Sequence, residues 1–127
     1  MTASLSTRAI LLVDDDREVL DVVATLLSLE THVPVRSFTS PQAALQAFAA
    51  QPEGFQLVVT DFDMPGMNGA DLLRQIRALR PELPAFVFSG SARQDIVASG
   101  LPADCPFLEK PAGLPALVEA IQIAEAA

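Results

Sequence analysis

Short hydrophobic runs alternate with amphipathic stretches from one end of the chain to the other. Five of these runs are rich in β-branched and aromatic side chains and are bounded by turn residues, which is typical of strands buried on both faces. The predicted strands are residues 10–13, 33–38, 57–60, 85–88 and 107–109.

Between these runs, hydrophobic residues recur three and four positions apart, which predicts amphipathic helices. The apolar positions of the first helix are Val19, Val22, Val23, Leu26 and Leu27. Those of the helix after the third strand are Leu72, Leu73, Ile76 and Leu79. We expect a solvated face on that helix, formed by Arg74, Arg77 and Arg80. The apolar positions of the last helix are Leu117, Val118 and Ile121.

Capping and helix-breaking residues mark the remaining boundaries. Ser40 followed by Pro41 predicts a helix start, because serine caps helices and proline suits the first helical position. The last helix is expected to begin near Pro115, whereas a short helix over 94–99 is only weakly marked. The resulting βαβαβαβαβα order predicts an α/β fold that is doubly wound, with a parallel sheet and helices on both faces. A ligand crevice is expected at the carboxyl ends of the strands.

Length and composition restrict the class of protein. The 127 residues fit a single domain, 1–127, half of it hydrophobic, with residues 1–8 frayed and no output domain after the last helix. A net charge of −8 argues against direct binding to nucleic acid or to an anionic membrane. The single cysteine excludes an internal disulfide, and no hydrophobic run has the length of a membrane helix. We therefore expect a cytoplasmic protein.

Polar residues whose side chains can bind a ligand or take part in a reaction follow four of the five predicted strands. They are Asp14, Asp15 and Asp16 after the first strand, Asp61 and Asp63 after the third, Ser89 after the fourth and Lys110 after the fifth. In a parallel sheet these residues gather at one edge, around one crevice. Carboxylates packed together repel one another unless a cation joins them, and an open set of oxygen ligands suits Mg²⁺ better than zinc.

This set of groups is suited to phosphoryl transfer. Asp61 is the candidate nucleophile, while the cation and Lys110 would neutralise charge on the equatorial phosphoryl oxygens. Gly66, Gly69 and Gly90 are expected to leave room for a phosphoryl group near the backbone.

Four blocks of sequence carry a family resemblance. They are residues 12–15 (LVDD), 60–69 (TDFDMPGMNG), 88–90 (FSG) and 109–111 (EKP). In order and spacing they resemble the receiver domain of bacterial two-component response regulators, and the resemblance covers nearly the whole chain. It implies a five-stranded sheet in the order 2-1-3-4-5. It also implies a phosphoacceptor signalling module, which is not an enzyme beyond catalysing its own phosphorylation and dephosphorylation.

The resemblance also assigns roles to individual residues. It implies that Asp61 is the phosphoacceptor and that Mg²⁺ is held by Asp14, Asp15 and Asp61. Asp15 would bind the ion directly and Asp14 largely through water, with the backbone carbonyl of Asp63 as a further ligand. The phosphodonor would be a histidine kinase or a histidine phosphotransfer protein. The chain would be a stand-alone regulator or the receiver part of a hybrid histidine kinase.

The family's switch is expected at Ser89 and Phe107. Ser89 and Lys110 would bind the phosphoryl group, and movement of Ser89 would leave a space into which Phe107 turns. That change would alter the surface formed by the fourth helix, the fifth strand and the fifth helix, which is a possible homodimer interface. Phe107 is equally suited to a plain core position.

Other interpretations of these residues stay open from the sequence. Asp14, Asp15 and Asp16 are also suited to the N-terminus of the first helix, where carboxylates favour the helix dipole. The Asp61-x-Asp63 pair resembles that of haloacid-dehalogenase-type phosphatases, although Met64 and Pro65 follow it here. A third possibility is an interaction module on the same fold that works without phosphorylation.

Overall fold

The computed structural model describes residues 8–90, 104–110 and 113–126. Its strands are β1 (Ala9–Val13), β2 (Val35–Phe38), β3 (Phe55–Thr60), β4 (Ala85–Ser89) and β5 (Phe107–Glu109). Its helices are α2 (Arg17–Thr31), α3 (Pro41–Ala50), α4 (Gly69–Leu79) and α6 (Leu114–Ala126), with a 3₁₀ turn η1 (Pro52–Gly54). The predicted helix over 94–99 and, apart from Arg8, the predicted frayed start lie outside the described residues. None of the described helices is long and apolar enough to cross a bilayer.

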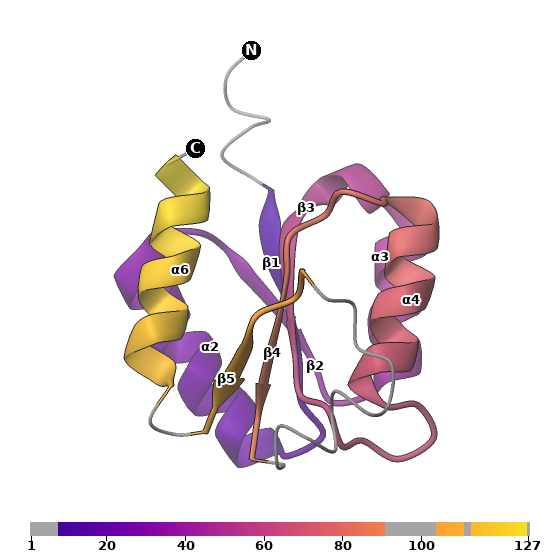
Figure 1. The fold of residues 1–127 in the computed structure, drawn as a ribbon, viewed down its shortest axis with the longest axis horizontal. Coiled ribbons are helices and arrows are strands. Elements are labelled where there is room, and N and C mark those ends of the chain that lie inside the picture. The colour runs from indigo at the N-terminus through magenta and orange to yellow at the C-terminus, as the bar shows by residue number, and fades with distance from the viewer. Residues whose placement is uncertain (1–7, 91–103, 111–112, 127) are drawn as a thin grey trace.

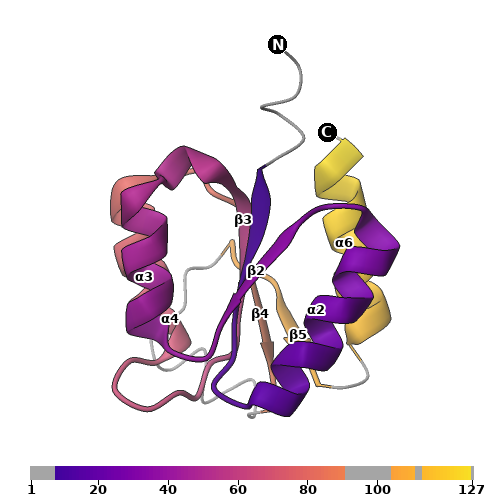
Figure 2. The ribbon, with the colours of Figure 1, turned by 180° about the vertical axis from the view of Figure 1, so that it is seen from behind.

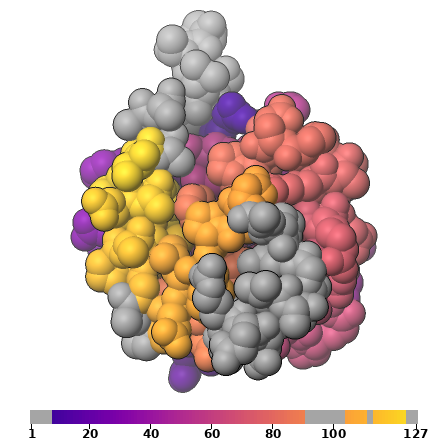
Figure 3. All heavy atoms as spheres, viewed as in Figure 1, coloured from indigo at the N-terminus to yellow at the C-terminus, as the bar shows by residue number. Residues whose placement is uncertain are grey.

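The five strands form one sheet in the order β2-β1-β3-β4-β5, and every neighbouring pair is parallel. Helices α3 and α4 cover one face of the sheet, and α2 and α6 cover the other (Figures 1 and 2). On the side seen in Figure 3, the orange surface of β5 lies between the yellow α6 and the salmon α4. The predicted α/β fold and strand order are confirmed.

Alternating side chains of the central strands feed two separate hydrophobic layers. In β1, Leu11 and Val13 pack on the side of α3 and α4, whereas Ile10 and Leu12 pack on the side of α2 and α6. All residues of β1 and β4 are buried, as expected. The prediction of burial on both faces is wrong for β2 and β5, since these edge strands have a neighbour on one side only and stay partly exposed.

Side-chain caps fix where three of the helices begin. Asp16 accepts hydrogen bonds from two backbone N–H groups in the first turn of α2, and Ser40 accepts one from Ala43 at the start of α3. Both caps confirm the sequence interpretation. The Asn68 side chain accepts the N–H of Asp71 at 2.8 Å and so caps α4 in the same way.

Two residues assigned to helical core faces lie at the surface. Val22 is 57% exposed on α2 and Leu79 is 48% exposed on α4. The predicted core positions Val23 and Leu27 are buried, and Leu20 and Thr31 of the same helix are buried with them. Helical periodicity identifies an apolar stripe, but the width of the stripe that is covered depends on how closely the sheet and the neighbouring helix approach it.

The prediction of a solvated arginine face on α4 and its end is also wrong for two of its three members. The guanidinium of Arg80 donates to the carbonyl oxygens of Pro52 and Phe55, at 2.8 Å and 2.6 Å. Arg77 donates to the carboxylate of Asp104 at 2.7 Å. Only Arg74 remains on an exposed face, where it pairs with a carboxylate of the same helix. The other two arginines bind groups outside the helix, which helical periodicity does not predict.

The burial contrast within α2 leads to a stability prediction. We expect Leu27→Ala to lower the free energy of unfolding by about 2–5 kcal/mol, because Leu27 is fully buried and its removal leaves a cavity. Leu29→Ala, on the same helix, is the matched control: Leu29 is 66% exposed and its loss should change stability by less than about 0.5 kcal/mol. Urea unfolding followed by circular dichroism measures both. Equal losses in the two variants would contradict the observed packing of α2.

Candidate functional site

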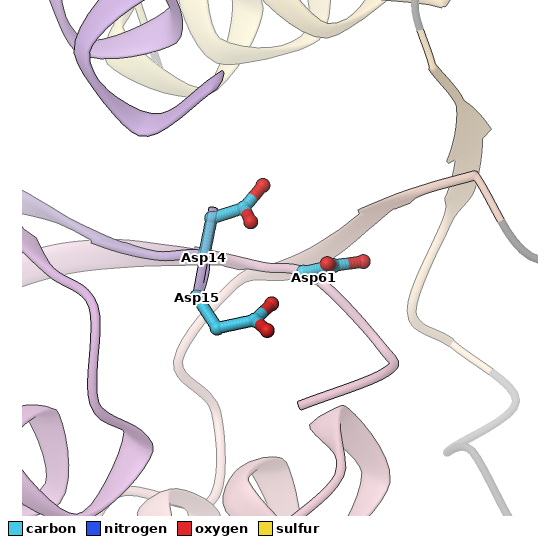
Figure 4. A group of neighbouring side chains, drawn as sticks. All are labelled: Asp14, Asp15 and Asp61. Atoms are coloured by element: carbon cyan, nitrogen blue, oxygen red, sulfur yellow. The ribbon is translucent and has the colours of Figure 1, made fainter. Parts of the chain in front are cut away.

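The pairing of β1 with β3 brings two aspartates side by side at the carboxyl edge of the sheet. Val13 and Thr60 are register partners, and the N–H of Asp61 donates to the carbonyl of Val13 at 2.9 Å. Asp14 and Asp61, the next residues on each strand, therefore emerge together. Their carboxylates and that of Asp15 point to the same side (Figure 4), and one oxygen atom from each of the three lies within 4.8 Å of the other two.

Lys110 approaches these carboxylates from the end of the edge strand β5. Its Nζ lies 2.6 Å from Asp14 Oδ2 and 3.4 Å from Asp61 Oδ2. The backbone places it there, because Ser89 and Glu109 are register partners and the N–H of Lys110 donates to the carbonyl of Ser89 at 3.0 Å. An ammonium group thus sits between two carboxylates that come from strands far apart in the sequence.

Backbone and side-chain groups hold the two inner carboxylates in place. Asp61 Oδ1 accepts the N–H of Phe62 at 2.7 Å, and the hydroxyl of Thr60 donates to the carbonyl of Asp61 at 2.8 Å. Asp14 Oδ1 accepts the N–H of Asp16 at 2.9 Å. Only 10% of the Asp61 side chain and 6% of that of Asp14 is exposed. One edge of each carboxylate is therefore fixed while the other faces the cluster.

Burial and neighbouring charge act in opposite directions on the pKa values here. Burial raises the pKa of Asp14, and the hydrogen bond from Lys110 only partly offsets that rise. Burial lowers the pKa of Lys110, but the hydrogen bond to Asp14 and the charge of Asp61 outweigh it, so that this pKa lies above its usual value. The ammonium group of Lys110 therefore stays charged. For the charged carboxylate of Asp14, the contact with Lys110 offsets only part of the cost of burial.

The donor set fits a divalent cation. Three carboxylates and one ammonium group leave two negative charges in the cluster, which matches the charge of such an ion. All the available ligand atoms are oxygens, the type that hard cations bind. Asp15 is exposed, so the cluster has one side open to water. The acidic cluster predicted from the sequence is thus compatible with metal binding.

The other predicted site residues are placed as follows. Ser89 is buried at the end of β4, and Val87, two residues earlier on the same strand face, is the register partner of Phe107. Phe107 is half-buried and packs against the hydrophobic layer beneath α3 and α4. The side chain of Asp63 is exposed and lies outside the carboxylate cluster in the described part of the chain.

Sequence reasoning missed two features of the site. The first is the role of Thr60, which was treated only as a strand residue. Its hydroxyl also donates a hydrogen bond to the backbone carbonyl of Asp61. The second is an open apolar groove of about 420 Å³ beside Lys110, which was hidden because Val22 had been assigned to the core. The groove is lined by Glu18, Val19, Val22, Val23, Phe88, Lys110 and Leu114.

Comparisons with known proteins agree with this geometry. Residues 10–122 match the family model for the response regulator receiver domain. A two-component response regulator of Arabidopsis thaliana, ARR14, is 35% identical over 80% of this chain and 27% of its own length. The transcriptional activator protein ExaE of Pseudomonas putida is 35% identical over 89% of this chain and 53% of its own length. The chain therefore spans about a quarter of the length of the first relative and about half of the length of the second.

Solved structures give the same result. A response regulator receiver domain protein from Clostridium thermocellum superposes with a TM-score of 0.82 at 26% identity, covering 91% of this chain and 92% of that one. A CheY-like receiver domain protein from Methanospirillum hungatei superposes with a TM-score of 0.80 at 28% identity, covering 93% of each chain. These matches favour the receiver interpretation over the phosphatase one. The chain belongs to the response regulator receiver domain family, whose members are phosphoacceptor signalling modules.

Proposed function

We propose that Asp61 accepts a phosphoryl group from the phosphohistidine of a histidine kinase or histidine phosphotransfer protein. The observation that carries this proposal is the position of its carboxylate, 3.4 Å from the Lys110 ammonium and clustered with Asp14 and Asp15. The P–N bond of the phosphohistidine, protonated on its other ring nitrogen, breaks, a P–O bond to an Asp61 oxygen forms, and the donor's histidine side chain leaves as neutral imidazole. Later attack of water on phosphorus releases inorganic phosphate and restores the carboxylate.

We assign the metal of this site as Mg²⁺. The side chains of Asp14, Asp15 and Asp61 would hold it, Asp14 largely through water, together with the backbone carbonyl of Asp63. When bound, Mg²⁺ supplies positive charge that stabilises the phosphoryl oxygens during transfer. The support for this assignment is the all-oxygen donor set and the two uncompensated negative charges of the cluster.

Lys110 and Ser89 would bind the phosphoryl group once it is on Asp61. The Lys110 ammonium already lies between Asp14 and Asp61, so it can pair with a phosphoryl oxygen after a small movement. Ser89 ends β4 at the same edge of the sheet, where its hydroxyl can donate a hydrogen bond to another phosphoryl oxygen. On this proposal the chain catalyses only its own phosphorylation and dephosphorylation.

The proposed function is tested by intact mass spectrometry. The whole chain is incubated with Mg²⁺ and a small phosphodonor such as acetyl phosphate, and we expect it to gain the mass of one phosphoryl group. Removal of Mg²⁺ with a chelator should abolish the gain, because the clustered carboxylates then lack the charge that offsets the incoming phosphoryl group. If no adduct forms while a phosphoryl mimic such as beryllofluoride also fails to bind, an interaction module that works without phosphorylation would be the better interpretation.

We propose that phosphorylation is transmitted through Ser89 and Phe107. Both residues lie on the same face of the sheet, on neighbouring parallel strands that are in register. Movement of Ser89 toward the phosphoryl group would open space beside Phe107, which is only half-buried and could turn into that space. The surface altered by this switch would include β5 and α6. The predicted homodimer through that surface stays a prediction, since the helix expected at 94–99 lies outside the described residues.

A serine replacement separates phosphorylation from switching. We expect Ser89→Ala to bind beryllofluoride but to lose most of the resulting amide chemical-shift changes at residues 107, 108 and 116–118, which do not contact the ligand directly. Its hydroxyl is the group that would move toward the ligand. The shift changes at residues 14, 15 and 62, next to the ligand, should persist and serve as the internal control. Shift changes at residues 107 and 108 that survive at wild-type size in Ser89→Ala would refute the switch.

We also propose that the chain is one receiver domain that acts in the cytoplasm. The family match over residues 10–122 and the single sheet support the first statement. The need for a phosphohistidine donor and Mg²⁺ supports the second. Both a stand-alone regulator and the receiver of a hybrid kinase are compatible with this role.

A further inference from the structure

Two glycines abut the main chain on either side of the Asp61–Lys110 pair. A Cβ atom added at Gly69 would lie 2.6 Å from the carbonyl oxygen of Asp61 and 3.1 Å from the Cα of Phe62. A Cβ atom added at Gly113 would lie 2.8 Å from the carbonyl oxygen and 3.0 Å from the nitrogen of Glu109, the residue before Lys110. Real Cβ atoms essentially never approach backbone atoms as closely as 2.6 Å or 2.8 Å, so any side chain would push the neighbouring segment away.

The requirement at these positions is for space, not for an unusual backbone conformation. Among the described glycines only Gly66 has a positive φ, of 83°. The other described glycines are also less crowded: a Cβ at Gly54 would meet nothing closer than 3.5 Å, and one at Gly90 nothing within 4 Å. Close approach to backbone is therefore confined, in the described part of the chain, to Gly69 and Gly113.

Hydrogen bonds hold both glycines against the same segments. The N–H of Gly69 donates to the carbonyl of Phe62 at 2.8 Å, and the N–H of Gly113 donates to the carbonyl of Glu109 at 2.6 Å. Gly69 is the first residue of α4 and Gly113 immediately precedes α6. The starts of two helices on opposite faces of the sheet are thus docked directly onto the backbone that carries the acceptor and the ammonium group.

We infer that Gly69 and Gly113 are positioning residues for phosphoryl transfer. Gly69 sets the place of the Asp61 backbone and Gly113 sets that of the Lys110 backbone, and together they maintain the 3.4 Å separation of carboxylate and ammonium. This inference rests on the proposed function of Asp61. It replaces the expectation that Gly69 leaves room for the phosphoryl group: the space at Gly69 is taken by the carbonyl of Asp61 itself. A displacement of about 1 Å in a reacting group can slow transfer about a hundredfold.

The test compares Gly69→Ala and Gly113→Ala with Gly54→Ala, in the whole chain. Gly54 is the matched control because its added methyl group has room and lies in η1, away from the site. The rate of adduct formation is measured by intact mass with excess acetyl phosphate and Mg²⁺. Mg²⁺ affinity is measured separately by titration of amide chemical shifts at residues 14, 15 and 62. Circular dichroism gives the folded fraction at the assay temperature.

The two variants should differ in a way that general destabilisation does not produce. Gly69→Ala should slow adduct formation by about tenfold or more and also weaken Mg²⁺ binding, because it moves Asp61. Gly113→Ala should slow adduct formation by about tenfold without weakening Mg²⁺ binding, because Lys110 is not a metal ligand and its movement away from Asp14 removes a competing positive charge. Gly54→Ala should match the wild type in both measurements.

Each outcome has a defined meaning. Folded Gly69→Ala and Gly113→Ala variants that are phosphorylated at the wild-type rate would overturn the positioning role and leave the proposed function intact. Failure of the wild type itself to gain a phosphoryl group would overturn the proposed function, and the inference with it. If Gly69→Ala does not fold, Gly113→Ala carries the test by the same criteria.

Discussion

Asp61→Asn is expected to abolish the phosphoryl adduct while leaving the fold intact. The substitution replaces one carboxylate oxygen by an amide nitrogen. An amide oxygen is not a nucleophile toward phosphorus, so phosphoryl transfer to residue 61 is lost. The asparagine has the shape of the aspartate, and its Oδ1 can still accept the N–H of Phe62. Removal of one of three clustered negative charges should also make the metal-free fold at least as stable as the wild type. Intact mass and thermal unfolding measure the two effects.

Asp63→Asn is the control for this experiment. Asp63 belongs to the same loop, but its side chain is exposed and lies outside the carboxylate cluster in the described structure. Its proposed role as a ligand uses the backbone carbonyl, which the substitution keeps. The control should therefore gain one phosphoryl group as the wild type does. An adduct of wild-type yield in Asp61→Asn would place the acceptor at another residue.

Lys110→Met is expected to have the second largest effect, on both transfer and stability. Loss of the ammonium group removes a charge that lies 3.4 Å from Asp61, the proposed acceptor, and removal of one such electrostatic contact typically slows a reaction by about 10²–10³-fold. In the absence of metal, the free energy of unfolding should also fall by about 1–3 kcal/mol, because Asp14 is left buried without its partner. Added Mg²⁺ should restore part of that stability, since it supplies positive charge to the same carboxylates.

The matched control is Arg74→Met, which also removes a cation from a carboxylate. The Arg74–Asp71 pair lies on the surface of α4, with side chains that are 54% and 42% exposed, so it should contribute less than about 1 kcal/mol. Urea unfolding with and without Mg²⁺, together with rates of adduct formation, covers both variants. Equal stability losses in the two variants, or no response of Lys110→Met to Mg²⁺, would contradict the contacts described for Lys110.

The elements of this fold could be predicted from the sequence because the signals that create them are local. Alternation of apolar runs and helical stripes located all five strands to within two residues at each end, and Ser40 and Asp16 marked helix starts through side chains that cap adjacent turns. The gathering of Asp14, Asp61 and Lys110 at one edge also followed from order alone. In a parallel sheet every strand ends on the same side, whatever the details of packing.

Features that depend on the distance between remote segments came only from the tertiary structure. The sequence pattern assigned Val22 to the core and Arg80 to solvent, yet Val22 is exposed and Arg80 bonds to backbone 25 and 28 residues away. Likewise Gly69 was expected to leave space for a ligand, but a Cβ atom at this position would lie 2.6 Å from the carbonyl oxygen of Asp61.

The physical reason is that periodicity and composition describe a residue's neighbours along the chain. Burial, hydrogen bonding and steric fit are decided by neighbours in space. The contact of 2.6 Å between Lys110 and Asp14 joins residues 96 positions apart. It depends on sheet register, on the turn after β5 and on side-chain rotamers together. The sequence therefore identified the carboxylates and the ammonium group that gather at this edge of the sheet, and packing of the helices against the sheet set their separations.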